Sequence, residues 1–318
     1  MAPCKYRKSL NYFFNYLSLK LTITNIQLVN MRKRFLLFFA SIIFISITAF
    51  PQTGKVMDNL SMTSKILKME RKYAVYLPPD YESSDRSYPV LYLLHGGGDD
   101  QTGWVQFGEV LHITDKAINE GNATPMVIIM PDANTGTRGF SNNVTGTWRY
   151  EDFFFEELMP FVEKKYRIKA EKKYRAISGL SMGGDGTFTY ALHHPELFSA
   201  ACPLSAGTGP LTIEDAATRL KRDNPNLADS FIQKFYNRQS VLALVNAMTD
   251  SLKKSVRWYI DCGDDDFLYE GNSLVHIAMR KREIPHEFRT RDGAHNWTYW
   301  RAALPEVLEF ISMGFHQF

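Results

Sequence analysis

Cysteine is scarce in this sequence, with three residues in a chain of 318: Cys4, Cys202 and Cys262. They show none of the spacings with which cysteine and histidine surround a metal ion, so we expect no such metal centre. Cys202 and Cys262 lie in apolar runs that predict core strands. A disulfide between them would be possible if the protein is exported to an oxidising compartment. We favour two buried thiols, because free cysteine behaves as a small apolar residue in protein cores.

A large net charge is also lacking. The formal charge is +3, but residues 1–50 contain seven Lys and Arg and no Asp or Glu. Without these seven positive charges the formal charge changes from +3 to −4. The basic balance belongs to the N-terminal segment, and nothing in the rest of the chain indicates a nucleic-acid partner.

The N-terminal segment contains an apolar run with the features of a targeting sequence. Residues 31–50 form a short basic head followed by apolar residues, which is typical of a signal peptide and rather short for a membrane span. We expect a signal peptide over residues 31–52 and a periplasmic or secreted protein without stable membrane insertion. Residues 1–30 show no domain-like pattern, so we interpret Met31 as the start and the earlier residues as a non-native upstream extension. An N-terminal membrane anchor is the alternative.

The remaining sequence has no internal repeat and no low-complexity linker, which favours one domain over residues 53–318. Apolar runs alternate with segments of helical periodicity and predict an α/β fold with a mostly parallel central sheet and helices on both faces. The polar stretch 208–237 predicts an insertion over one end of the sheet. The predicted strands are 71–81, 88–98, 125–132, 174–178, 199–207, 256–263 and 286–293. The predicted helices are 108–120, 151–166, 182–193, 240–254, 272–283 and 300–313.

Residues 176–186 read AISGLSMGGDG, a serine between glycines at the end of a predicted strand. A phosphate-binding loop requires a lysine after the second glycine of G-x-x-x-x-G-K. Gly179 and Gly184 have this spacing, but Asp185 occupies the lysine position and its carboxylate would repel phosphate. The dinucleotide-binding pattern G-x-G-x-x-G cannot be read in this stretch either.

The same stretch fits G-x-S-x-G from Gly179 to Gly183, with Ser181 at its centre. It lies between a predicted strand and a predicted helix, the context in which a nucleophile elbow exposes a serine hydroxyl. Glycines are needed there because side chains at these positions would collide with the strand and the helix. A structural turn without chemistry is the alternative.

A nucleophilic serine needs a carboxylate and a histidine, which follow it in that order in folds with this elbow. His295 lies in a glycine-containing loop directly after the last predicted strand. The other histidines after Ser181 lie in predicted helices, at a strand start or at the chain end. The acid should come from the loop after the penultimate strand, where spacing does not choose among the candidates. These are Asp261, Asp264, Asp265, Asp266 and Glu270.

Five ordered motifs carry a family resemblance: YLLHGGGDDQTGW, YEDFFFEELMPFVEKKYR, AISGLSMGG, CGDDDFLYEGN and GAHNWTYW. Together they resemble the esterase D-like α/β-hydrolases, and more narrowly the bacterial feruloyl and acetyl xylan esterases of carbohydrate esterase family one. The resemblance covers essentially the whole chain after residue 52. It implies an α/β-hydrolase fold and a serine esterase that acts on plant cell-wall polysaccharide esters and needs no cofactor or metal.

The resemblance also implies residue roles, since the family's acid loop usually reads C-G-x-x-D. Asp264 and Asp265 depart from the family, which commonly has a small polar residue and a variable one there. This extra charge leaves Asp265 as an alternative acid. The implied roles are Ser181 as nucleophile, Asp266 as acid and His295 as base, with the backbone N–H groups of Gly97 and Met182 as the oxyanion hole.

Aromatic residues in or beside predicted loops at the catalytic end would suit a feruloyl ring or the face of a sugar. We expect a feruloyl esterase, with an acetyl xylan esterase or another small-acyl carbohydrate esterase as the alternative. Formylglutathione-type thiol-ester hydrolysis is disfavoured by export. An inactive hydrolase-fold binding module is disfavoured because all three catalytic positions are filled. The candidate substrate-binding residues are Trp104, Trp148, Phe267, Tyr269 and Trp297, while Trp300 is expected in core packing.

Overall fold

The computed structural model of the protein describes residues 15–21, 24, 27–33, 53–134 and 139–316. The chain divides into two compact units, Met1–Pro51 and Gln52–Phe318. In the first unit, residues 15–21 and 27–33 are helical and exposed. No helix among the described residues is long and apolar enough to cross a membrane. From residue 34 onward, the predicted signal peptide lies outside the described residues.

The second unit is built on one sheet, in which the described residues form eight strands in the order β1-β2-β4-β3-β5-β6-β7-β8. β2 runs antiparallel to β1 and β4, whereas all neighbours from β4 to β8 are parallel. The predicted α/β fold with a mostly parallel sheet is therefore confirmed. The strands are β1 (Lys55–Ser64), β2 (Met69–Leu77), β3 (Val90–Leu94), β4 (Val127–Pro131), β5 (Arg175–Leu180), β6 (Ala200–Leu204), β7 (Arg257–Asp261) and β8 (His286–Arg289).

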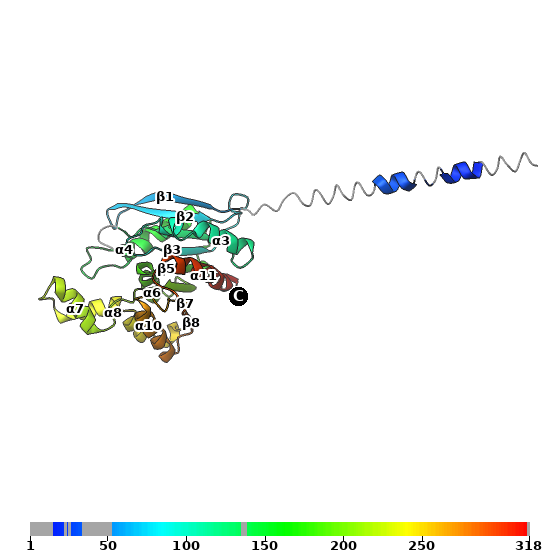
Figure 1. Ribbon diagram of the computed structural model, residues 1–318. Helices are drawn as coiled ribbons and strands as arrows, with labels where there is room; N and C mark the ends of the chain where they lie inside the picture. Colours follow the sequence, from blue (N-terminus) through cyan, green and yellow to red (C-terminus); the bar gives the residue numbers. More distant parts are fainter. Residues whose placement is uncertain (1–14, 22–23, 25–26, 34–52, 135–138, 317–318) are drawn as a thin grey trace, which may run out of the picture. The chain divides into compact units, whose positions relative to one another are not determined.

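Helices cover both faces of this sheet (Figure 1). One face carries α3 and α11, and the other carries α5, α6, α9, α10 and the π-helical turn η1. The helical elements are α2 (Gly103–Gln106), α3 (Val110–Asn119), α4 (Tyr150–Phe153), η1 (Phe154–Leu158), α5 (Met159–Lys165), η2 (Lys172–Tyr174), α6 (Met182–His193), α7 (Ile213–Asp223), α8 (Asp229–Gln239), α9 (Val241–Ala247), η3 (Asp250–Leu252), α10 (Tyr269–Lys281) and α11 (Trp297–His316).

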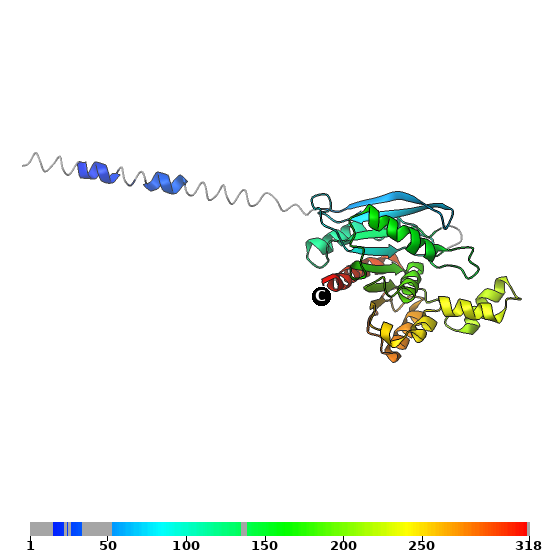
Figure 2. The same cartoon turned by 180° about the vertical axis from the view of Figure 1, so that it is seen from behind.

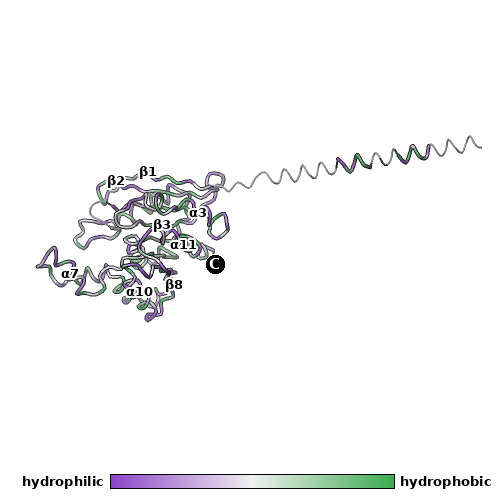
Figure 3. The backbone as a smooth tube through the Cα atoms, viewed as in Figure 1, coloured by the Kyte–Doolittle hydropathy of each residue, from purple (hydrophilic) through white to green (hydrophobic). Residues whose placement is uncertain are grey.

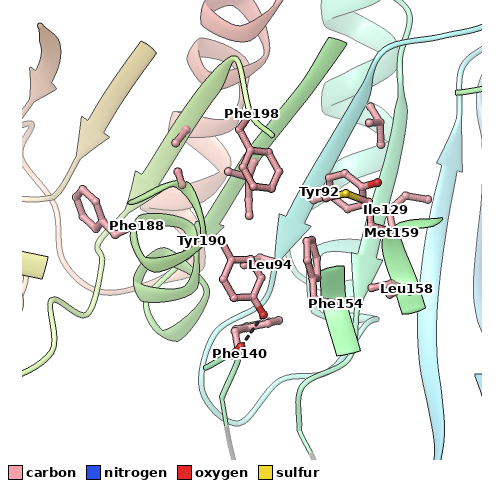
Figure 4. Packing of buried hydrophobic residues seen from close by; sticks show 14 of the residues in the cluster. Tyr92, Leu94, Ile129, Phe140, Phe154, Leu158, Met159, Phe188, Tyr190 and Phe198 are labelled. Carbon is pink, nitrogen blue, oxygen red and sulfur yellow. Dashed lines mark hydrogen bonds between the residues drawn. The ribbon is translucent and has the colours of Figure 1, made fainter. Parts of the chain in front are cut away.

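The central strands are apolar on both sides, which is why both faces of the sheet can be covered. All five residues of β3 are buried. Val90, Tyr92 and Leu94 face one core, and Leu91 and Leu93 face the other, as the two-residue period of a strand requires. Figure 4 shows the first of these cores, where aromatic side chains of α6 and η1 pack against β3.

β1 is the strand that the sequence did not predict. It is an edge strand whose residues are mostly exposed or half-buried, and its register shifts between Met57 and Leu60. This irregularity interrupts the alternation of apolar and polar residues by which a strand is recognised. The predicted helix 240–254 is also shorter than expected, because it ends at Ala247 and is followed by the separate turn η3.

The predicted insertion 208–237 contains no strand and forms the helices α7 and α8. Thr212 begins α7 as an N-cap, with its side chain accepting a hydrogen bond from the Asp215 N–H. At the end of α8, Arg238 bonds the buried carboxylate of Glu151 in α4 at 2.7 Å. α7 and α8 project from the domain on the side of the loop before α4 (Figures 1 and 2), and hydrophilic residues recur along α7 (Figure 3).

Candidate active site

Ser181 lies on a sharp turn between β5 and α6, with φ 55° and ψ −114°. A positive φ is strained for a residue with a side chain. The flanking glycines allow this turn, since a Cβ at Gly179 would lie 2.5 Å from the Gly183 carbonyl oxygen. A Cβ at Gly183 would lie 2.5 Å from the Leu94 carbonyl oxygen. This is the geometry that the G-x-S-x-G spacing predicts.

The backbone of Ser181 is fixed by three hydrogen bonds. Its N–H donates to the Leu204 carbonyl at 2.9 Å, and its carbonyl accepts from the N–H groups of Asp185 and Gly207, both at 3.0 Å. These bonds tie the strained residue to the end of β6 and to the first turn of α6. The serine hydroxyl is thereby held at the carboxyl end of the sheet, where open α/β sheets place their ligands.

His295 connects Ser181 to Asp266. Its Nε2 lies 2.9 Å from Ser181 Oγ, and its Nδ1 lies 2.8 Å and 3.0 Å from the two Asp266 carboxylate oxygens. Because a carboxylate only accepts, Nδ1 carries the proton and Nε2 presents a lone pair to the hydroxyl. The arrangement can therefore take a proton from Ser181.

The Asp266 carboxylate is held ionised by its surroundings. Burial opposes ionisation, but hydrogen bonds from His295, the Leu268 N–H and Ser205 outweigh it, so the pKa of Asp266 lies below its usual value. A charged carboxylate can stabilise a protonated imidazole beside it.

The other acidic candidates in this part of the chain do not reach His295. Asp261 is buried within β7 and accepts hydrogen bonds from two tyrosines, while burial raises its pKa. Asp264 and Asp265 are exposed, and Glu270 lies in the first turn of α10. The structure thus brings Asp266 to the histidine and leaves Asp265 in solvent.

The two predicted oxyanion-hole residues, Gly97 and Met182, line one cavity of about 320 Å³ together with Gly98, Ala133 and Asn134. Met182 is the first residue of α6, so its N–H has no partner within the helix and lies at the positive end of the helix dipole. The cavity therefore adjoins the nucleophile and offers backbone donors to a developing negative charge.

His95 is a residue whose role sequence reasoning missed. Its Nε2 accepts a hydrogen bond from the Ala133 N–H at 2.9 Å, so Nδ1 carries the proton that it donates to the Gly96 carbonyl at 2.8 Å. Burial lowers the pKa of His95, which keeps the ring neutral. The imidazole thus joins the loop that carries Gly97 to the loop after β4. Its place in the H-G-G motif was the available signal.

Ser205 and Trp300 lie next to the acid and the base, respectively, and contact each other. Ser205 is buried at φ 43°, directly after β6, and its hydroxyl accepts a hydrogen bond from Trp300 Nε1 at 3.0 Å. The Ser205 side chain also lowers the pKa of Asp266. The Trp300 ring stands edge-on to His295, with 4.9 Å between ring centroids. Trp300 is buried as predicted. Ser205 was not singled out, because no sequence pattern marks its positive φ.

Three of the five aromatic residues proposed for substrate binding are at least partly exposed, and one of them, Phe267, lies beside His295. Phe267 is 76% exposed, and its ring centroid lies 4.5 Å from that of His295. Tyr269 is 38% exposed. Trp297 is half-buried and lies against Trp300, with 5.3 Å between ring centroids. These side chains stay predictions for substrate contact.

The other two require correction or relocation. Trp104 is 1% exposed and donates its indole N–H to the Leu94 carbonyl at 3.0 Å, so it belongs to the core and not to a substrate-facing wall. Trp148 is 6% exposed, donates to the Gly139 carbonyl and packs near Tyr150. It lines a pocket that is separate from the cavity at Gly97.

The cysteines and acidic residues provide little for a metal ion. Cys202 and Cys262 are buried free thiols, as favoured from the sequence, and burial raises the pKa of both. Among the described residues, one group of three carboxylates lies close enough to share an ion, and all three are exposed: Asp264, Asp265 and Asp292. Exposed acidic groups of this kind are no indication of a metal site without a bound ion.

Comparison with known proteins agrees with this geometry. The chain is 35% identical to a solved ferulic acid esterase, with a TM-score of 0.72 over 83% of this chain and 99% of that one. It is 38% identical over 141 residues to an endo-1,4-beta-xylanase/feruloyl esterase of Xylanibacter ruminicola, covering 42% of this chain and 19% of that protein. It is 23% identical over 273 residues to an acetyl esterase of Caldicellulosiruptor saccharolyticus, covering 80% and 97%.

The chain spans less than a third of the length of the curated relatives to which it is 38–39% identical. The family assignment rests on a longer match, since the Esterase family model covers residues 64–311. That range includes the elbow, the acid loop and the histidine loop. The resemblance indicated by the five sequence motifs is confirmed, and the chain belongs to the Esterase family, with the α/β-hydrolase fold.

Proposed function

We propose that the protein is a serine carboxylic-ester hydrolase that acts through an acyl-enzyme. The observation that carries this proposal is the continuous hydrogen-bond chain from Ser181 Oγ through His295 to Asp266, with contacts of 2.9 Å and 2.8 Å. The serine also occupies a strained turn of the kind that is common at active sites.

In the proposed reaction, His295 Nε2 takes the hydroxyl proton as Ser181 Oγ attacks the ester carbonyl carbon. The tetrahedral intermediate collapses and expels the alcohol, which receives that proton from His295. Water, deprotonated by the same nitrogen, then attacks the acyl-enzyme. The second tetrahedral intermediate collapses and releases the acid, while Ser181 Oγ receives the proton back from His295. Asp266 orients the imidazole and stabilises its protonated form throughout.

The oxygen that becomes negative in each tetrahedral intermediate is assigned to the N–H groups of Gly97 and Met182. Both residues line the cavity beside the elbow. A donor of this kind typically lowers the barrier by about 3 kcal/mol. The chemistry requires no cofactor and no metal ion.

For the substrate we propose feruloyl esters of plant cell-wall polysaccharides. The relative named ferulic acid esterase, at 35% identity, supports this choice. The accessible ring of Phe267 beside the catalytic histidine, with the partly exposed Tyr269 and Trp297, would contact an aromatic acyl group or a sugar face. The acetyl esterase relative keeps acetylated xylan as the second candidate, because its match covers 80% of the chain.

Action on cell-wall polymers requires export, and we propose that residues 31–52 direct the protein to the periplasm or the medium. Sequencing the amino terminus of the exported protein tests this point. A new terminus near residue 53 supports a cleaved signal peptide, whereas a membrane-bound protein that retains residues 31–52 supports an anchor.

The function is tested by comparing wild type with Ser181→Ala on methyl ferulate and on acetylated xylan. Ferulate release that disappears in the variant supports a serine feruloyl esterase. Acetate release alone keeps the proposed mechanism and moves the substrate to acetylated xylan. If wild type cleaves neither ester faster than the variant does, the proposed substrates are wrong and a binding role must be considered.

A further inference from the structure

A second pocket, of about 310 Å³, lies between the inserted helices and the loop before α4. We call it the insert pocket. This volume is at the low end of the range for small-molecule sites. Its lining includes Ser141, Trp148, Leu220, Phe231, Phe235 and Gln239.

The walls of the insert pocket are held in place by hydrogen bonds within the loop and by an ion pair to α4. Asn142 in the loop bonds the carboxylate of Asp152 at 2.7 Å, and the Trp148 N–H bonds the Asn143 side chain at 3.0 Å. On the opposite wall, Arg238 fixes the end of α8 to Glu151. The pocket is therefore shaped before any ligand arrives, which reduces the entropy lost on binding.

Both walls of the insert pocket are formed by segments whose neighbouring residues contact the elbow around Ser181. Gly209, at φ 67°, lies so close to the Gln239 backbone that a Cβ there would be 1.8 Å from the Gln239 carbonyl oxygen. Two residues earlier, the Gly207 N–H bonds the Ser181 carbonyl at 3.0 Å. On the other wall, Ser141 is preceded by Phe140, which lies against Gly186 in α6. A Cβ at Gly186 would lie 2.9 Å from the Cβ of Phe140. Both walls of the insert pocket are thus joined through the backbone to segments that pack against the elbow.

The lining combines aromatic rings with hydrogen-bonding groups. Phe231 and Phe235 are half-buried, so each leaves part of its surface accessible. The hydroxyl oxygen of Ser141 is buried and has no hydrogen-bond partner among the described residues. Amide and hydroxyl side chains make up half of the lining, five of ten residues, of which Asn142 and Asn143 already bond within the protein. Rings that stack on C–H faces, beside several polar groups, suit a sugar better than a feruloyl ring, which has few hydroxyls.

We propose that the insert pocket binds a sugar unit of the polysaccharide that carries the ester, and so adds affinity for the polymeric substrate. This inference rests on the proposed ester hydrolysis and names the part of the substrate that α7 and α8 recognise. The ester carbonyl would lie at Ser181, and a sugar unit further along the same polysaccharide would lie in the insert pocket.

The test uses the full chain and the variants Phe235→Ala and Phe235→Leu, with Tyr236→Ala as a matched control. Tyr236 is the next residue on α8, is also aromatic and half-buried, and does not line the pocket. Initial rates are measured on methyl ferulate and on a feruloylated arabinoxylo-oligosaccharide. Loss of one aromatic contact should raise KM for the oligosaccharide roughly three- to tenfold. The rates of both Phe235 variants on methyl ferulate should stay at the wild-type value. The rates of Tyr236→Ala should stay at the wild-type values on both esters.

Binding is measured separately by calorimetry, with unesterified arabinoxylo-oligosaccharide and the Ser181→Ala protein. The expected result is binding that Phe235→Ala weakens by the same factor. Equal losses on both esters would show that the pocket holds the acyl ring and would overturn the proposal. Absence of sugar binding, or no effect of either Phe235 variant, would overturn it as well. If wild type cleaves neither ester, the proposed hydrolysis fails, while calorimetry still decides whether the pocket binds sugar.

Discussion

The indole N–H of Trp300 donates a hydrogen bond to Ser205 Oγ at 3.0 Å, and the same side chain helps to hold the pKa of Asp266 below its usual value. Because its oxygen accepts from Trp300, Ser205 has its own proton available for the carboxylate. The first turns of α11, just after His295, are in this way tied to the acid that orients His295. Ser205 is a positioning residue that touches no reacting atom.

We expect Ser205→Ala to lower kcat about tenfold, since a hydrogen bond to a charged group contributes about 1.5–3 kcal/mol. KM for a small ester should change little. Loss of this donor raises the pKa of Asp266, so the carboxylate becomes protonated at a higher pH as the pH falls. The acidic limb of the kcat/KM profile should therefore move to higher pH, which a pH–rate series measures.

Ser312→Ala is the control for this experiment, because Ser312 is a buried serine in α11 that bonds the Leu308 carbonyl outside the site. It should leave both kcat and the pH profile at wild-type values. A lower melting temperature in Ser205→Ala with an unshifted acidic limb would show that Ser205 acts on stability alone.

The elbow predicts a second result, at Gly183. Alanine there would place a Cβ 2.5 Å from the Leu94 carbonyl oxygen, and backbone atoms cannot move away as a flexible side chain can. We expect Gly183→Ala to reduce the free energy of unfolding by about 1–3 kcal/mol or more, measured by urea denaturation. Gly97→Ala is the stability control, because nothing lies within 4 Å of a Cβ at Gly97. Equal stability of the two variants would contradict the close packing of the elbow.

The sequence located Ser181 and His295 because short-range signals mark them, namely glycine spacing for the serine and chain order for the histidine. It could not choose the acid, because four aspartates lie within six residues and differ only in the direction the turn gives them. That direction depends on a distant contact. Gly263 approaches Gly293 so closely that a Cβ at Gly263 would lie 2.1 Å from the Gly293 carbonyl oxygen.

The wrong prediction for Trp104 and the missed strand β1 also arise from contacts between distant parts of the chain. The sequence predicts Trp104 in the substrate wall because it lies in or beside a predicted loop at the catalytic end, yet its ring is buried and packs against Trp297. Whether an aromatic ring faces solvent or core depends on what the folded chain brings against it. β1 was missed for a related reason, since an exposed edge strand with an irregular register carries little apolar periodicity.

The attachment of the insertion to the domain leads to a prediction about motion. The Glu151 carboxylate is 2% exposed, and it receives Arg238 from α8 at 2.7 Å and His193 from α6 at 2.7 Å. Burial opposes the charge of Glu151, but the hydrogen bonds from the histidines and Arg238 outweigh it and hold its pKa well below the usual value. Glu151 is therefore a charged anchor for the end of α8.

We expect Arg238→Ala to loosen α8 without unfolding the domain, because the bonds of Glu151 to the histidines remain. Amide hydrogen exchange should accelerate in residues 210–240 and stay slow in the central strands. Lys221→Ala is the comparison variant, since Lys221 makes an exposed ion pair with Asp229 within the insertion and such pairs contribute little. Unchanged exchange in Arg238→Ala would show that α7 and α8 are held by apolar packing alone.

Asp185 makes stability depend on pH. It lies one turn after Ser181 in α6, and one carboxylate oxygen is buried without a hydrogen-bond partner among the described residues. Burial raises the pKa of Asp185 from 3.8 to about 7, and the positive charge of Arg219 opposes this increase. Between these pH values the folded protein holds a proton that the unfolded chain has released. The free energy of unfolding must therefore fall as the pH rises through this window, by up to about 1.4 kcal/mol per pH unit.

Asp185→Asn keeps the shape of the side chain and removes the titration. Its stability relative to wild type should increase from pH 4 to pH 7 and stay constant above pH 7, as measured by urea denaturation across that range. Arg219→Ala removes the opposing charge and so raises the pKa of Asp185 further. The free energy of unfolding of Arg219→Ala should therefore level off at a higher pH than that of wild type. If the difference between Asp185→Asn and wild type is the same at every pH, the carboxyl does not titrate in this window. Solvent must then reach the Asp185 carboxylate and stabilise its charge.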